Sequence, residues 1–210
     1  TQPGAARPPS AFETLLGRSG AIVMGILNVT PDSFSDGGQF ITPAQAIAHA
    51  RRMAAEGADI LDIGGASSRP YGGNIEPTAG EEKKRLEPVL AEVVGLGVPV
   101  SIDTTQSTVA DWALRTGAAI VNDVWGLQRD PDMARVVAEH RAPVIVMHNR
   151  HDADAAIDIM ADISAFLSRS LDIADKAGIP RANIVLDPGI GFGKTQPQSL
   201  EALARLDELL

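Results

Sequence analysis

An acid and a base lie close together near the C-terminal end of the chain, in the segment Asp187-Pro-Gly-Ile-Gly-Phe-Gly-Lys194. The residues before it, Asn183-Ile-Val-Leu, are typical of a short buried strand, so Asp187 falls at the end of that strand. The glycines allow backbone to approach a ligand closely. This spacing predicts a ligand-binding loop at the end of a strand.

Polar residues also follow five other strand-like runs, and they are Asn28, the Ser67-Ser68-Arg69 group, Asp103, Asn122 and His148. Polar side chains at the C-terminal ends of successive parallel strands are how an α/β barrel forms its active site. The sequence therefore predicts a shared site, to which each strand contributes one or two residues.

Some of these residues have chemistry suited to a phosphate and an aromatic ring. Asn28 could offer its side-chain oxygen to Mg²⁺, although an Asx-turn at the start of the loop would use the same residue. Arg69 presents a planar fork that fits phosphate oxygens, and the alternative is a surface arginine. Phe34 could stack on an aromatic substrate or fix its loop to the body of the protein.

Asp103, Asn122 and Asp187 are expected to converge near the barrel axis if their strands are parallel. Two carboxylates and an amide can together recognise a heterocycle that carries amino, ring N–H and carbonyl groups. Each acid could instead cap the following helix, but three polar residues at equivalent strand ends favour a common site. Met147 could lie under a flat ring, or it could fill the core.

Two familiar motifs fail at the loop that ends in Lys194. A P-loop needs glycine at the position of Pro188, and a dinucleotide fingerprint needs its third glycine where Lys194 stands. His148 has no partner at a metal-ligand spacing, so it is a poor metal site.

Six strand-like runs alternate with segments of helical spacing, and the runs are Ala21–Leu27, Ala58–Ile63, Val98–Ile102, Ala118–Val121, Pro143–Met147 and Asn183–Leu186. Thr42-Pro43 and Asp130-Pro131 are typical of helix N-termini, and Gly117 and Gly178 are typical of helix C-termini. This order predicts βα units with parallel strands and right-handed crossovers.

The fold class is therefore α/β. A doubly wound sheet would accept six units, but it collects ligands at one switch point, whereas a (β/α)₈ TIM barrel explains polar residues at every strand end. We expect such a barrel, with about six βα units present and the chain cut short after the last helical segment. Residues 1–20 are expected to form a flexible tail, and residues 21–210 a single domain.

The amino-acid composition limits the classes of partner that the protein is expected to bind. The net charge of −9 argues against nucleic acid and anionic membranes, and no apolar run approaches the length of a membrane helix. The chain has no cysteine, which suits a reducing cytoplasm. Small molecules are the expected ligands.

Five segments together closely resemble dihydropteroate synthase, and they are Gly25–Gly38, Asp62–Pro70, Ser101–Thr104, Val121–Val124 and Asp187–Lys194. The resemblance implies a (β/α)₈ barrel that condenses 6-hydroxymethyl-7,8-dihydropterin diphosphate with 4-aminobenzoate. The products are 7,8-dihydropteroate, for folate synthesis, and pyrophosphate. The resemblance also implies Mg²⁺, a cytoplasmic enzyme that is a homodimer when full length, and a sulfonamide target.

Carried over by position, the resemblance gives each residue a role. Asn28 would contact Mg²⁺. Ser68 and Arg69 would contact the diphosphate, and Phe34 and Pro70 would lie beside the aminobenzoate. The pterin would be bound by Asp103, Asn122, Asp187 and Met147, and Phe192 and Lys194 would also bind substrate. Asp103, Arg69 and Asp36 would be catalytic, with Asp36 in a loop that closes over the reaction.

The chain departs from the family pattern in two places. Ala66 stands where the family usually has Glu, and the family's Ser-Arg-Lys and Arg-x-His motifs of the seventh and eighth units are absent. Two other readings stay open: a folate-dependent methyltransferase barrel, which has no reason to carry the Asn28–Gly38 loop or Arg69, and a non-catalytic pterin-binding module.

Overall fold

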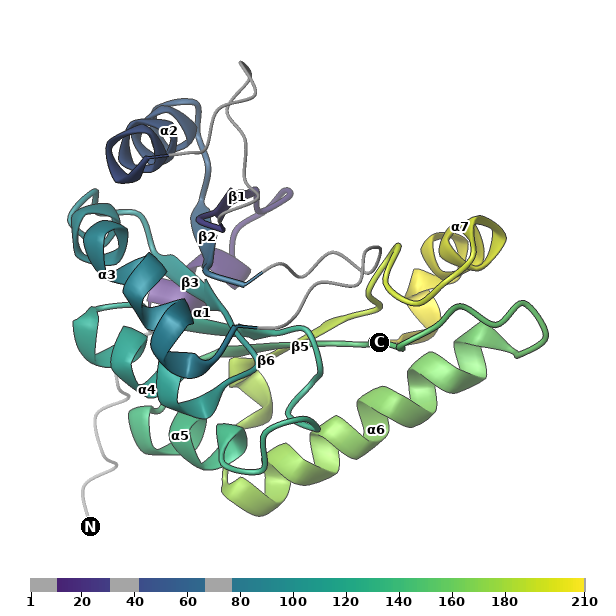
Figure 1. Cartoon of the computed structure of the whole chain (residues 1–210). Coiled ribbons are helices and arrows are strands. Elements are labelled where there is room, and N and C mark those ends of the chain that lie inside the picture. The colour runs from purple at the N-terminus through teal and green to yellow at the C-terminus, as the bar shows by residue number, and fades with distance from the viewer. Residues whose placement is uncertain (1–10, 31–41, 67–76, 210) are drawn as a thin grey trace, which may run out of the picture.

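A parallel sheet of six strands forms the centre of the molecule (Figure 1). The computed structural model describes residues 11–30, 42–66 and 77–209. The strands lie in the order in which they occur along the chain, and they are β1 (Met24–Asn28), β2 (Ile60–Gly64), β3 (Val100–Asp103), β4 (Ile120–Asp123), β5 (Val144–Met147) and β6 (Ile184–Asp187). All six predicted strands are confirmed, and every neighbouring pair is parallel.

Helices follow the strands and cover the outer face of the curved sheet (Figure 1). They are α2 (Pro43–Ala55), α3 (Ala79–Val94), α4 (Ser107–Thr116), α5 (Met133–His140), α6 (Ile159–Ala177) and α7 (Gln196–Ala204), with 3₁₀ turns at Arg181–Asn183 and Leu206–Leu209. The short helix α1 (Ala11–Leu16) precedes β1. From α2 to α7, each helix contacts the next one along the chain. The architecture is that of six consecutive units of a (β/α)₈ barrel.

The ends of the helices follow local sequence signals, with one exception. Thr42 caps α2 in a capping box, and Gly117 and Gly178 end α4 and α6 in the left-handed conformation, as predicted. Asp130 is not the N-cap residue of α5, which begins at Met133, although its Oδ1 accepts a hydrogen bond of 3.0 Å from the backbone N–H of Asp132. Its Oδ2 accepts a hydrogen bond of 2.7 Å from the backbone N–H of Ser107, the first residue of α4.

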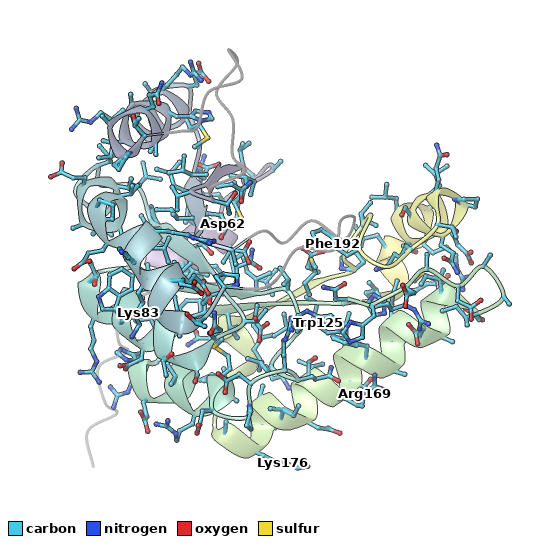
Figure 2. All side chains as sticks on the ribbon, in the orientation of Figure 1. Asp62, Lys83, Trp125, Arg169, Lys176 and Phe192 are labelled. Carbon is cyan, nitrogen blue, oxygen red and sulfur yellow. The ribbon has the colours of Figure 1, made fainter. Side chains whose placement is uncertain are left out.

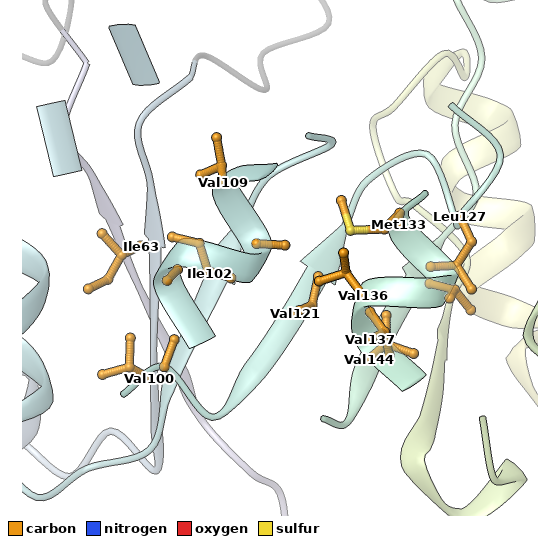
Figure 3. Close-up of a cluster of buried hydrophobic side chains, with 14 of the residues drawn as sticks. Ile63, Val100, Ile102, Val109, Val121, Leu127, Met133, Val136, Val137 and Val144 are labelled. Atoms are coloured by element: carbon orange, nitrogen blue, oxygen red, sulfur yellow. The ribbon is translucent and has the colours of Figure 1, made fainter. Parts of the chain in front are cut away.

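The main apolar core lies between the sheet and the helices. Alternate strand residues point outward, and valine and isoleucine predominate among them. Figure 3 shows Val136 and Val137 of α5 beside Val121 and Val144 of the sheet. Buried β-branched residues on both sides of this layer fix the positions of the strands, and through them the positions of the strand ends.

A second apolar cluster fills the inner face near the N-terminal ends of the strands. Ile60, Ile120 and Ile145 contact Phe12 of α1, whose side chain is only 6% exposed. Residues 11–16 of the expected flexible tail are therefore helical, and Phe12 closes the lower end of the sheet. Burying a phenylalanine side chain stabilises a fold by about 2–3 kcal/mol, which accounts for the order of this short helix.

The sheet has two edge strands, β1 and β6, which are not paired with each other in the part of the chain that the structure describes. Ile26, on the inner face of β1, is 52% exposed, and Leu200 of α7 is 60% exposed. None of the helices among the described residues is both long enough and apolar enough to cross a membrane.

Candidate active site

Four inward-facing residues form one row across the C-terminal ends of four strands. Asn28 is paired with Gly64, Gly64 with Asp103, and Asp103 with Asn122. Paired residues of neighbouring strands point to the same face of a sheet. The predicted convergence of Asp103 and Asn122 is therefore confirmed, and Asn28 lies in the same row.

A second pair continues this surface on the last two strands. Met147 of β5 is paired with Asp187 of β6, on the same inner face. Met147 is 4% exposed, whereas Asp187 is half-buried. An apolar side chain and a carboxylate therefore lie next to each other at the strand ends. This is consistent with a site that holds a flat, polar ring, although the contact of Met147 with a ligand stays a prediction.

Gly64 leaves space in the middle of the row. A Cβ atom at this position would lie 3.2 Å from Oδ2 of Asp103 and 3.5 Å from Oδ1 of Asn28. Both oxygens therefore face the small volume above the glycine. A larger residue would fill that volume and separate the two polar groups from any ligand.

Asp62 lies beneath the row, and the sequence reasoning did not select it. Its side chain is 2% exposed, and its Oδ2 accepts a hydrogen bond of 3.1 Å from Nδ2 of Asn122, across the intervening strand β3. Burial raises the pKa of Asp62 to about 6. In Figure 2, Asp62 lies on the side of the sheet away from α4, α5 and α6. A charged residue inside the apolar strand Ile60–Gly64 was the signal that could have found it.

The loop after β6 is shaped by Asp187 and three glycines. Oδ1 of Asp187 accepts a hydrogen bond of 2.7 Å from the backbone N–H of Gly189. Gly189, Gly191 and Gly193 all have positive φ angles, which residues with a side chain rarely adopt. Asp187 thus stabilises the turn of its own loop, while Thr195 caps the next helix, α7. Phe192 is half-buried in this loop (Figure 2).

The ammonium group of Lys194 forms hydrogen bonds within its own loop. Nζ donates hydrogen bonds to the carbonyl oxygens of Gly189, at 2.7 Å, and Phe192, at 3.1 Å. It also lies 2.7 Å from Nδ1 of His148 at the end of β5. The Lys194 side chain is 2% exposed. These contacts indicate that Lys194 supports the loop, and its predicted contact with substrate stays a prediction.

His148 is fully buried and connects this loop to α6. The sequence analysis did not predict this connection. Its Nε2 lies 2.9 Å from Oδ2 of Asp162, and the same oxygen accepts a hydrogen bond of 2.8 Å from Arg150. Burial and the positive charge of Lys194 lower the pKa of His148 to about 4, and burial lowers the pKa of Lys194 to about 8. At neutral pH the imidazole is uncharged, so Nδ1 accepts from Lys194 and Nε2–H donates to Asp162.

Five predicted site residues lie outside the described residues, and they are Phe34, Asp36, Ser68, Arg69 and Pro70. The described part of the site contains two carboxylates, two amides and a methionine at the strand ends. This set can pair with several donors and acceptors of a polar ring. No group of three or more His, Cys, Asp or Glu residues that could hold a metal ion occurs in the described part of the chain.

Comparisons with known proteins agree with this geometry. The family model described as pterin binding enzyme matches residues 24–210. The dihydropteroate synthase of Bacillus subtilis is 46% identical over 89% of this chain and 65% of that protein. That of Clostridium beijerinckii is 45% identical over 89% of this chain and 69% of that protein. The chain thus spans about two thirds of the length of these curated relatives.

Solved structures give the same answer. A dihydropteroate synthase from Clostridium difficile, determined in the presence of pteroic acid, has a TM-score of 0.81 and 47% identity, covering 89% of this chain and 71% of that one. The Xanthomonas albilineans enzyme with 4-aminobenzoic acid has a TM-score of 0.82 and 43% identity, covering 89% and 68%. The chain therefore belongs to the pterin binding enzymes, and within them to the dihydropteroate synthase family.

Proposed function

We propose that the protein carries out the dihydropteroate synthase reaction. In this reaction 6-hydroxymethyl-7,8-dihydropterin diphosphate and 4-aminobenzoate give 7,8-dihydropteroate and pyrophosphate. The observation that carries the proposal is the continuous row of Asn28, Gly64, Asp103 and Asn122, with Met147 and Asp187 beside it. Relatives at about 45% identity that are named dihydropteroate synthase support it, and so does a related structure with bound 6-hydroxymethylpterin-monophosphate.

The pterin has donors and acceptors that match this row. Carboxylates accept from amino and ring N–H groups, and an amide can both accept and donate. In the proposal, Asp103, Asn122 and Asp187 bind the pterin ring and Met147 contacts its face. The turn that Asp187 makes with Gly189 uses one of its oxygens and leaves the other for the ligand. Phe192, at the same loop, is placed in the substrate site by the resemblance alone.

The chemistry requires charge stabilisation and no protein nucleophile. The C–O bond to the diphosphate breaks, its electron pair leaves with pyrophosphate, and the aryl amine forms the new C–N bond and loses a proton. Positive charge that develops on the pterin would be stabilised by Asp103, because a carboxylate in a partly buried site interacts strongly with a nearby cation. Ser68 and Arg69 would bind the diphosphate. Phe34 and Pro70 would contact the aminobenzoate, and Asp36 would lie in the loop that closes the site.

The donor set fits Mg²⁺ as part of a site that the substrate completes. Oδ1 of Asn28 and Oδ2 of Asp103 both face the space above Gly64, and Mg²⁺ prefers such hard oxygen ligands. Few protein ligands are needed, because Mg²⁺ keeps several waters and bridges to phosphates. When bound, it would neutralise charge on the departing diphosphate. In the proposal Asn28 is its protein contact.

A homodimer and a cytoplasmic location complete the proposal. The apolar residues exposed on α7, Leu200 and Leu203, support contact with further protein. The absence of cysteine suits a reducing compartment.

The test combines binding with turnover. Calorimetry with 6-hydroxymethylpterin measures the pterin site, and release of pyrophosphate from the pterin diphosphate measures the reaction. We expect release that requires both Mg²⁺ and 4-aminobenzoate. Asp103→Asn should lower turnover by about 100-fold or more, whereas Asp172→Asn, at an exposed acid of α6, should leave it unchanged.

The outcomes separate the possible readings. Pterin binding without any release of pyrophosphate would show a pterin-binding module and contradict a synthase. Release without dependence on 4-aminobenzoate would contradict the condensation. Near-normal turnover of Asp103→Asn would contradict the role of Asp103 and leave the overall reaction standing.

A further inference from the structure

Asp62 is a buried carboxylate that the proposed reaction does not use. It is 2% exposed, and its register partner on β3, Ser101, is fully buried. Within the described part of the chain, Oδ1 of Asp62 and Oγ of Ser101 make no hydrogen bond. Burying a carboxylate costs free energy that a single hydrogen bond does not recover. Stability alone therefore does not account for an acid at this position.

The hydrogen bond that Asp62 makes across β3 is with a residue of the site. Nδ2 of Asn122 donates to Oδ2 of Asp62 at 3.1 Å. An amide can lie in two orientations that exchange its N and O ends, and its neighbours decide between them. The reverse orientation would place the amide oxygen against an ionised carboxylate, with two acceptors facing each other. Asp62 therefore selects the orientation in which the NH₂ group of Asn122 faces β2.

We propose that Asp62 is a positioning residue for pterin recognition, acting through Asn122. By holding Nδ2, it directs the carbonyl oxygen Oδ1 of Asn122 away from itself and toward the ligand, as an acceptor for an N–H group of the pterin. This inference rests on the proposed function, because the ligand is the pterin of that reaction. Asp103, paired with Asn122 in the same row, supplies the neighbouring acceptor.

The charge state of Asp62 agrees with this role. Burial raises its pKa to about 6, against the opposing effects of Ser101 and Asn122, so the carboxylate is largely ionised at neutral pH. The ionised carboxylate has no proton to donate. It can therefore only accept a hydrogen bond, here from Nδ2 of Asn122. Asp123, also fully buried with a pKa raised to about 6 by burial, differs because its two oxygens accept from the backbone N–H groups of Trp125 and Leu127.

The test is a double-mutant cycle on the affinity for 6-hydroxymethylpterin, measured by calorimetry. Asp62→Asn keeps the size of the side chain but can donate to Oδ1 of Asn122 and so reverse the amide. We expect this variant to bind the pterin about tenfold more weakly or worse. In the background of Asn122→Ala, the same change at Asp62 should alter affinity by less than about twofold. Asp172→Asn, at an exposed acid of α6, is the control and should bind normally.

A purely structural role for Asp62 gives different results. Asp62→Leu removes the buried charge, and we expect it to unfold at the same or higher urea concentration while binding the pterin more weakly. Loss of stability together with unchanged affinity would overturn the inference. The inference would also be overturned if the fold-changes in affinity caused by Asp62→Asn and Asn122→Ala simply multiplied in the double mutant.

A measurement without ligand tests the inference even in variants whose affinity for the pterin is too weak to measure. The side-chain NH₂ signal of Asn122 in a ¹⁵N–¹H spectrum should lie downfield in the wild type and shift in Asp62→Asn. An unchanged signal would also overturn the inference. If the wild-type chain binds no pterin, the proposed function fails and the inference fails with it. If the wild type binds and the cycle is additive, the inference alone fails.

Discussion

Nζ of Lys194 lies 2.7 Å from Nδ1 of His148, although both side chains are almost fully buried. The two residues belong to different βα units, and their contact joins the loop after β6 to the end of β5. Because the lysine is the donor, the imidazole must accept through Nδ1 and remain uncharged. The position of the loop therefore depends on the protonation state of His148.

The first prediction concerns the pH dependence of stability. His148 has its pKa lowered from 6.5 to about 4, first by burial and then by the charge of Lys194. Between these values the unfolded chain binds a proton that the folded chain does not. The contribution of His148 to the free energy of unfolding is therefore fully present above pH 6.5 and is lost as pH falls to about 4. The full difference is up to about 3 kcal/mol.

Urea unfolding of the wild type and of His148→Gln between pH 7 and pH 4.5 measures this contribution. The wild type should lose stability more steeply than the variant as pH falls. Asp62 and Asp123, whose pKa values are raised to about 6, act in the opposite direction in both proteins and cancel in the difference. Parallel curves for the two proteins would contradict the prediction.

The second prediction concerns Lys194. Lys194→Met removes the donor to the carbonyl oxygens of Gly189 and Phe192 and leaves both without this partner. We expect a loss of about 3 kcal/mol in the free energy of unfolding. The pKa of His148 should rise toward its ordinary value, because the charge of Lys194 is one of the two main causes that lower it.

Unfolding in urea and titration of the imidazole by NMR test these two effects separately. Lys176→Met, at an exposed lysine of α6, is the control and should change stability by less than about 0.5 kcal/mol. An imidazole that titrates at the same pH in Lys194→Met and in the wild type would show that the ammonium does not face Nδ1.

The loop glycines allow a third prediction with an internal control. Gly189 and Gly191 have φ angles of +65° and +83°. A Cβ atom at Gly189 would overlap the carbonyl oxygen of His148, whereas one at Gly191 would meet no atom within 4 Å. Gly191→Ala should therefore cost only the backbone strain, about 1–2 kcal/mol. Gly189→Ala must also displace the loop and should cost clearly more, as measured by urea unfolding. Equal costs would contradict the close approach of Gly189 to His148.

Local sequence signals were sufficient for the strands and most helix ends. A continuous apolar run such as Val144–Met147 and a capping threonine such as Thr42 act within a few residues, so their effect can be read from the chain. The signal at Asp130-Pro131 was read only in part, because one carboxylate oxygen accepts from Asp132 just before α5 and the other accepts from Ser107, 23 residues earlier. Which helix an aspartate caps was decided by tertiary packing.

The candidate site shows the same division. Asp103, Asn122 and Asp187 could be predicted, because the end of a strand is a local property and parallel strands bring their ends together. Asp62 and His148 could not, because their roles depend on partners 60 and 46 residues away. Lys194 was selected for its type and position, but only the fold shows that carbonyl oxygens of its own loop and the imidazole of His148 surround its ammonium.

The last prediction concerns Phe12, which the sequence placed in a flexible tail. A helix of six residues is not stable by itself in water, so α1 must be held by its contacts with the sheet. Phe12→Ala would remove the side chain that covers Ile60, Ile120 and Ile145. We expect a loss of about 3–4 kcal/mol in the free energy of unfolding, measured with urea. Leu16→Ala in the same helix is the control and should cost far less, because Leu16 is 46% exposed.

The same variant separates the stability of the barrel from the integrity of the site. Phe12 contacts the N-terminal half of the sheet, whereas Asn28, Asp103 and Asn122 lie at the opposite ends of the strands. Ile145 of the Phe12 cluster is also the register partner of Asn122, but no residue of the row belongs to that cluster. Under conditions in which Phe12→Ala is folded, its affinity for 6-hydroxymethylpterin should therefore stay within a few-fold of that of the wild type. A large loss of affinity in the folded variant would show that α1 supports the row of site residues through the strands.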